Sequence, residues 1–160
     1  MELGSKTCAK HLGGVESIRL LPACELKSIE YYPSERLFTT LEMQNQGVPI
    51  EVNFAEGTAS YEERVAADGV VTHTLRFAMR GFEQESVEAL CRLSVDGIVA
   101  IVKPQEGKGL LVGYSPQTAA DSPLRLVEAH LDGGDNPKQR TSTTITLACC
   151  DGSLACYFEE

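Results

Sequence analysis

Alternation of apolar and polar residues dominates the 160-residue chain, and turn-forming Gly, Pro, Asn and Asp separate the alternating segments. Because side chains of a strand point alternately to its two faces, a period of two predicts strands. We expect strands at residues 15–21, 24–31, 50–54, 59–65, 70–80, 98–103, 109–114, 124–129, 141–149 and 154–158. Between Pro33 and Val48 no period is visible, so this segment is expected to be a loop.

Two Asp-Gly dipeptides lie between neighbouring strand segments, and this pairing favours the positive φ angles of a tight hairpin turn. Asp68-Gly69 is expected to join strand 59–65 to strand 70–80. Asp151-Gly152 is expected to join strand 141–149 to strand 154–158. The sequence therefore predicts two hairpins.

One segment, residues 83–96, changes to a helical period. Val87, Leu90, Cys91 and Val95 stand at i, i+3, i+4 and i+8, which places them on one stripe of a helix. The predicted fold class is therefore mainly β, an antiparallel β-sandwich or barrel with one amphipathic α-helix at about 83–96.

Length and composition fit a single β-rich domain over residues 1–160, with residues 1–14 as a loosely ordered N-terminal arm. The N-terminus lacks the basic and apolar regions of a secretory signal, and no apolar run reaches the roughly 18 to 20 residues of a membrane span. We expect a protein that is cytoplasmic at synthesis and does not contact a membrane.

The chain is acidic: 14 Lys and Arg stand against 23 Asp and Glu, a formal net charge of -9. Proteins that grip nucleic acid gain affinity by replacing counterions with Lys and Arg, and an acidic domain would oppose that step. Tight nucleic-acid binding is therefore not expected.

The cysteines give no sign of a metal site. No C-x-x-C pair occurs, and the adjacent Cys149 and Cys150 would point to opposite faces of a strand. Cys91 falls on the apolar stripe of the predicted helix, where a thiol would be unreactive. We expect reduced thiols at all six positions, Cys8, Cys24, Cys91, Cys149, Cys150 and Cys156.

The histidines give no sign of a catalytic triad. His11, His73 and His130 lie in no recognisable nucleophile or base motif. His73 shares a strand face with Leu75 and Phe77, which favours a buried or half-buried, hydrogen-bonded histidine over a general base.

The carboxylates also receive a structural interpretation. Neighbours on a strand point opposite ways, so Glu62-Glu63 and Glu159-Glu160 are interpreted as solvated charge. The loop with Asp132, Asp135 and Asn136 lacks the spacing of a helix-loop-helix calcium site, and its residues suit a turn. We therefore predict no catalytic, cofactor-binding or metal-binding residue, no cofactor, and no enzymatic activity.

The order of elements, together with four phrases of sequence, resembles that of small virion structural proteins of tailed bacteriophages and prophages, of the tail-tube or head-to-tail connector kind. The phrases are VTHTLRFAMRG (71–81), GIVAIVKPQEGKGLLVGYSP (97–116), SPLRLVEAHLDGGD (122–135) and STTITLACCDGSLACYF (142–158). The resemblance implies a β-sandwich or barrel module with a flanking helix that self-associates into a ring or tube, contacts other virion proteins, and is located in the virion.

If the resemblance holds, a negative lumen would repel DNA phosphates and let the genome slide. The segments 33–46 and 119–123 are then candidates for contact with neighbouring subunits. A second class remains open: a β-domain that binds a small ligand or a protein as a monomer or dimer. A third, an enzyme that uses a thiol, has the least support because Cys91 is expected to be inert.

Overall fold

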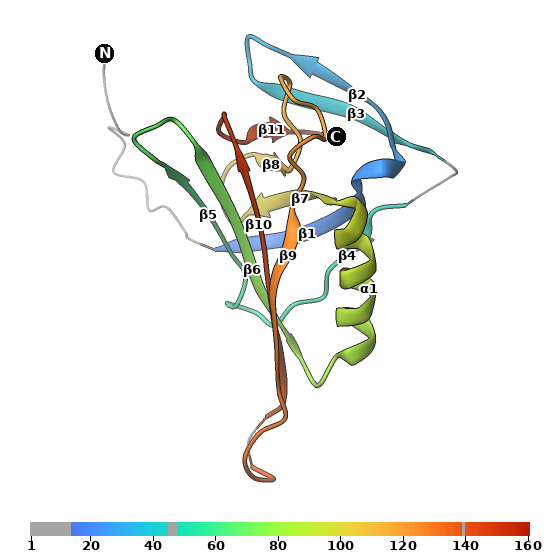
Figure 1. The fold of residues 1–160 in the computed structure, drawn as a ribbon, viewed down its shortest axis with the longest axis vertical. Helices are drawn as coiled ribbons and strands as arrows, with labels where there is room; N and C mark the ends of the chain where they lie inside the picture. The colour runs from blue at the N-terminus through green and yellow to red at the C-terminus, as the bar shows by residue number, and fades with distance from the viewer. Residues whose placement is uncertain (1–13, 45–47, 139) are drawn as a thin grey trace.

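The chain folds into two β-sheets with one α-helix beside them (Figure 1). In the computed structural model the described part comprises residues 14–44, 48–138 and 140–160, and 52% of the chain is strand. Both sheets are open, so the expected mainly β, sandwich-like fold is confirmed and the barrel alternative is not adopted. The arm expected at 1–14 lies, except for Gly14, outside the described residues.

The first sheet has seven strands in the spatial order β2-β3-β11-β8-β7-β1-β4. In chain order these are Val15–Pro22 (β1), Leu26–Tyr32 (β2), Leu37–Met43 (β3), Ile50–Glu51 (β4), Ile98–Pro104 (β7), Gly109–Val112 (β8) and Cys156–Phe158 (β11). A short 3-10 turn, Ala23–Glu25 (η1), separates β1 from β2.

The second sheet has four antiparallel strands in the order β5-β6-β10-β9. They span Ser60–Val65 (β5), Val71–Arg80 (β6), Arg125–Asp132 (β9) and Ser142–Asp151 (β10). The β9–β10 hairpin projects beyond the rest of the fold (Figure 1). The hairpin predicted at Asp68-Gly69 joins β5 to β6, and Gly69 has the expected positive φ of 86°.

The main core lies between the two sheets. Leu20 and Ala100 from the first sheet and Leu75, Phe77 and Ile145 from the second belong to one buried cluster. A second buried cluster, which includes Phe38, Val99 and Leu111, lies on the other face of the seven-stranded sheet. The long apolar run that predicted a buried strand at 98–103 is explained by these two clusters, because β7 is buried on both faces.

The helix α1 spans Gln84–Asp96, in agreement with the prediction of a helix at about 83–96. Its buried face differs from the predicted stripe. Leu90 is buried and Leu93 packs beside it, whereas Cys91 is exposed and Val95 is 75% exposed. The inference that Cys91 lies on an apolar face is therefore wrong. No helix in the described part of the chain is long and apolar enough to span a membrane.

Two strand predictions need correction. Strand β3 occupies the segment 33–48 that was expected to be a loop. Its alternation is hidden because Leu37 and Phe38 are both buried and because Thr40 has a positive φ of 51°. The strand predicted at 50–54 is only two residues long, since the chain leaves the first sheet after Val52 and reaches the second at Ala55, whose N–H bonds to the Ala78 carbonyl.

The hairpin expected at Asp151-Gly152 does not form. After β10 the chain crosses from the second sheet to the first, where β11 pairs in parallel with β3 and antiparallel with β8. Cys156 and Phe158 are buried in the second cluster, whereas the buried hydrophobic residues of β10 belong to the first. The alternating pattern predicted the strand but could not show which sheet it joins.

Candidate functional site

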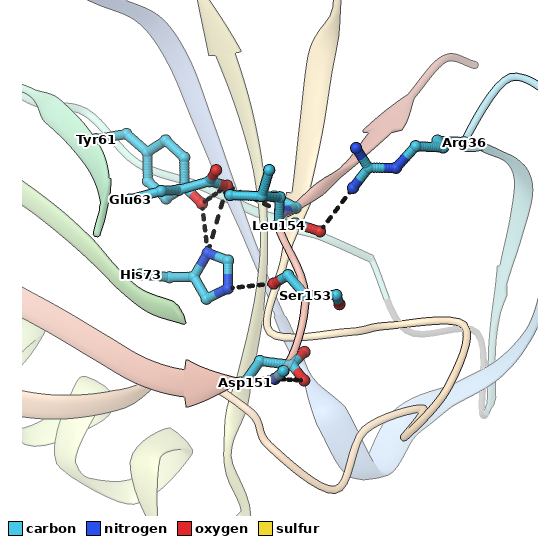
Figure 2. Close-up of polar contacts among 9 residues, drawn as sticks. Arg36, Tyr61, Glu63, His73, Asp151, Ser153 and Leu154 are labelled. Carbon is cyan, nitrogen blue, oxygen red and sulfur yellow. Dashed lines mark hydrogen bonds and ion pairs between the residues drawn. The ribbon is translucent and has the colours of Figure 1, made fainter. Parts of the chain in front are cut away.

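A cluster of three polar side chains lies between the two sheets near the end of the β5–β6 hairpin (Figure 2). Tyr61 and Glu63 come from β5 and His73 from β6. The Tyr61 hydroxyl donates to Glu63 Oε1 at 2.7 Å and lies 2.8 Å from His73 Nδ1. Glu63 Oε1 lies 3.4 Å from the same nitrogen. We call these three residues the Tyr61–Glu63–His73 cluster.

The hairpin register brings the cluster together. Glu63 lies directly opposite His73 in the antiparallel pair, and Tyr61 lies two residues along on the same face. His73 is 3% exposed, on the face shared with Leu75 and Phe77, as its position in the sequence suggested.

The cluster also holds the segment that crosses between the sheets. His73 Nε2 lies 3.1 Å from the Ser153 carbonyl oxygen, and the Ala155 N–H donates to Glu63 Oε1 at 2.9 Å. Arg36, in the turn between β2 and β3, donates to the Leu154 carbonyl at 3.1 Å (Figure 2). Three consecutive residues of the crossing are therefore bound by side chains.

Burial affects the chemistry of the cluster. It raises the pKa of Tyr61 far above the ordinary value of 10.0, and the hydrogen bond to Glu63 and its charge raise this pKa further. Tyr61 is therefore a neutral phenol that keeps its hydrogen. Both nitrogens of His73 are engaged within the fold, so neither is free to take a proton from a bound substrate.

Ser153 does not complete a catalytic triad with this histidine. Its Oγ is buried and has no hydrogen-bond partner, while His73 Nε2 is directed to the Ser153 carbonyl oxygen. A serine nucleophile needs its hydroxyl on the base nitrogen. The geometry of the cluster is that of a structural connection between the sheets.

An open groove of about 680 Å³ lies between α1, the end of β6 and the crossing at residues 50–56. Leu20, Phe77 and Leu90 reach its floor, and Ala89 lines its helix side. Ser86 and Glu83 also line the groove, and the Ser86 hydroxyl donates to the Glu83 carboxylate at 3.1 Å. The groove leads toward the main core.

The remaining sequence candidates take structural positions. Cys149 is buried and Cys150 exposed, so the prediction that they point to opposite faces is confirmed. Among the described residues no group of three or more His, Cys, Asp or Glu could hold a metal ion. In the loop after β9, Asp132 Oδ1 accepts the Gly134 N–H and Asn136 Oδ1 accepts the Lys138 N–H, as expected of turn residues. Cys8 and His11 lie outside the described part of the chain.

One interpretation of a carboxylate is wrong. Glu62 is exposed beside Arg64, but Glu63 points inward and is tied to Tyr61 and Ala155 rather than solvated. The Asp68-Gly69 dipeptide does not show this pairing: a two-residue turn centred on it would place Arg64 opposite His73, whereas the observed register is centred on Asp68 and pairs Glu63 with His73. A shift of one residue in the register decides whether Glu63 or Arg64 faces His73.

A comparison with known protein families, curated proteins and solved structures found no match to this chain.

Proposed function

We propose that the chain is a non-enzymatic structural protein of a phage or prophage virion, which assembles into a ring or tube through the edges of its four-stranded sheet. The observation that supports this is the pair of open edges. Among the described residues, β5 and β9 have no strand on their outer sides. Unpaired edges present main-chain N–H and C=O groups to another chain.

The strand order of this sheet suits head-to-tail pairing. Its four strands alternate in direction, so β5 and β9 run antiparallel to each other. When copies are related by a rotation that keeps strand direction, β9 of one copy meets β5 of the next in antiparallel fashion, and the sheet continues. Such heterologous contacts close into rings when the rotation divides a full turn.

The free part of the β9 edge has the same length as the β5 edge. The end of α1 covers the start of β9, because the Leu126 N–H donates to Ser94 Oγ at 2.8 Å and Arg125 donates to the Ser94 carbonyl at 2.7 Å. The segment 127–132 extends beyond that contact, and Val127 is 65% exposed. These six positions correspond to the six residues of β5.

The outer face of this sheet does not carry the acidic excess of the chain. By strand alternation and register it presents four arginines and three carboxylates, namely Arg64, Arg76, Arg80, Arg125, Glu62, Glu128 and Asp132. If this face lines a lumen, the lumen is close to neutral. The hypothesis of a negative lumen is therefore not part of the proposal.

Light scattering on the full chain, over a range of protein concentrations, tests the proposal. We expect rings or larger polymers, and we expect Val127→Lys to raise the dissociation constant of the assembly at least about tenfold, because a charge on an edge strand opposes pairing. Val48→Lys is the matched control, since Val48 is 76% exposed and lies outside both sheets.

A monomer or dimer that does not change with concentration would contradict the assembly proposal. It would favour the alternative, a β-domain that binds a small ligand or a protein. Equal effects of Val127→Lys and Val48→Lys would show that the β9 edge is not the contact.

A further inference from the structure

The last strand is a small element with a large structural role. β11 has three residues and lies between β3 and β8. In the strand order, β2 and β3 join the other strands of the seven-stranded sheet through β11. Whatever holds the crossing segment 153–155 in place therefore also holds the two parts of this sheet together.

The Tyr61–Glu63–His73 cluster, which holds this crossing, needs a hydrogen at particular atoms to satisfy its contacts. The Ser153 carbonyl can only accept, so His73 Nε2 must carry a hydrogen to bond to it. The Tyr61 oxygen makes two short contacts, at 2.7 Å to Glu63 Oε1 and at 2.8 Å to His73 Nδ1, but a phenol has one hydrogen. With that hydrogen on the bond to Glu63, the contact with His73 needs a second hydrogen, which Nδ1 can supply.

We propose that the Tyr61–Glu63–His73 cluster is a proton-dependent latch, in which His73 carries a hydrogen on both ring nitrogens and holds the crossing to β11 closed. In this state His73 Nε2–H donates to the Ser153 carbonyl and Nδ1–H donates to the Tyr61 oxygen. Tyr61 donates to Glu63, and the positive ring lies beside the Glu63 carboxylate at 3.4 Å.

Loss of the Nδ1 hydrogen opens the latch. Tyr61 can then satisfy either Glu63 or His73 but not both, and the remaining contact brings two lone pairs together at hydrogen-bond distance. The half-buried Glu63 carboxylate also loses its positive partner. Since Glu63 holds the Ala155 N–H and His73 holds the Ser153 carbonyl, both changes weaken the hold on the crossing.

The other ionisable groups around His73 each have a defined protonation state or a hydrogen-bond partner. Cys149 on β10 lies opposite His73 in the register, and burial raises the pKa of its thiol to about 12. Asp151 at the end of β10 accepts the Gly152 N–H, and Arg36 donates to the Leu154 carbonyl. Tyr61 and Glu63 on β5 belong to the latch itself.

Hydrogen exchange of the full chain at pH 6 and pH 9, corrected for intrinsic exchange rates, tests the latch. We expect protection of residues 153–158 to fall at least about tenfold more than protection of β6 and β10, because one satisfied buried contact is lost. His73→Gln should remove this pH dependence. His130→Gln is the matched control, since His130 is an exposed histidine on β9, and it should leave the dependence unchanged.

A second measurement does not depend on a variant that folds. Nitrogen NMR of the wild-type imidazoles at pH 6 should show hydrogens on both Nδ1 and Nε2 of His73. A ring with a hydrogen on Nε2 alone at pH 6 would overturn the proposal. So would equal protection of residues 153–158 at the two pH values, or a pH dependence retained by a folded His73→Gln variant.

Discussion

At the scale of single residues, buried polar side chains restrict how the elements of this protein can be arranged. His73 and Thr143 are 3% and 0% exposed, and each is fully engaged in hydrogen bonds. Thr143 holds the entry to α1, because its hydroxyl donates to the Gly81 carbonyl and accepts the Glu83 N–H. Buried groups of this kind fix one arrangement, since any other would leave a donor or acceptor without a partner.

Cys149 provides a test at this scale. Burial, followed by the nearby Asp151 and Cys150, raises the pKa of its thiol from 9.0 to about 12. The folded state then holds this proton more tightly than the unfolded state. The contribution to stability is complete below about pH 9 and is lost as the pH rises toward 12.

We therefore expect the free energy of unfolding to fall between pH 9 and pH 12 in chemical denaturation, and to fall less steeply in Cys149→Ala. At pH 8, alkylation followed by mass spectrometry should label the exposed Cys150 in the folded chain and Cys149 only after unfolding. Labelling of both at the same rate would contradict the burial of Cys149.

At the scale of elements, the boundary between α1 and β7 depends on one glycine. Gly97 ends the helix with a φ of 95°, and its N–H donates to the Leu93 carbonyl. A Cβ at this position would lie 2.3 Å from Pro123 Cγ. Both the backbone angle and the space therefore exclude a side chain here.

We expect Gly97→Ala to lower the free energy of unfolding by about 3 kcal/mol, from the strained φ and the clash with Pro123 together. Gly133→Ala is the control, because a Cβ there meets nothing within 4 Å, and it should change stability by less than about 0.5 kcal/mol. Urea denaturation of both variants measures the difference. A Gly97→Ala variant as stable as Gly133→Ala would refute this account of the boundary.

At the scale of the whole molecule, the two sheets are linked by crossings at both ends of the core. Residues 52–55 pass from β4 to the second sheet, and residues 152–155 return from β10 to β11. The β2–β3 hairpin depends on the second crossing, because β11 lies between β3 and β8.

Phe158 tests that dependence. It is 5% exposed in the second buried cluster, so Phe158→Ala should cost about 3 to 5 kcal/mol in urea denaturation and should speed hydrogen exchange in β2 and β3 more than in β6. Tyr157→Ala is the neighbouring control, since Tyr157 is 42% exposed, and it should cost about 1 kcal/mol or less. Undisturbed exchange in β2 and β3 after Phe158→Ala would show that this hairpin is held independently of β11.

Sequence patterns predicted most strands because alternating burial leaves a direct trace in polarity. They failed at β3, where two consecutive residues are buried, and at the helix, where Cys91 and Val95 occupy stripe positions yet face solvent. They also missed the cluster, because a two-residue turn at Asp68-Gly69 would pair Arg64 with His73, whereas the observed register, centred on Asp68, pairs Glu63 with His73. A pattern of one strand cannot show what its neighbours contribute.

The amino-acid sequence by itself determined the mainly β class, the helix at about 83–96 and the β5–β6 hairpin, because each depends on local periodicity and turn chemistry. The tertiary structure decided where β11 pairs, which face of α1 is buried, and that Tyr61, Glu63 and His73 meet the crossing at Ser153 and Ala155. These features join residues 45 or more positions apart or depend on a partner surface. Contacts of that range are fixed by the packing of the two sheets, which local patterns do not encode.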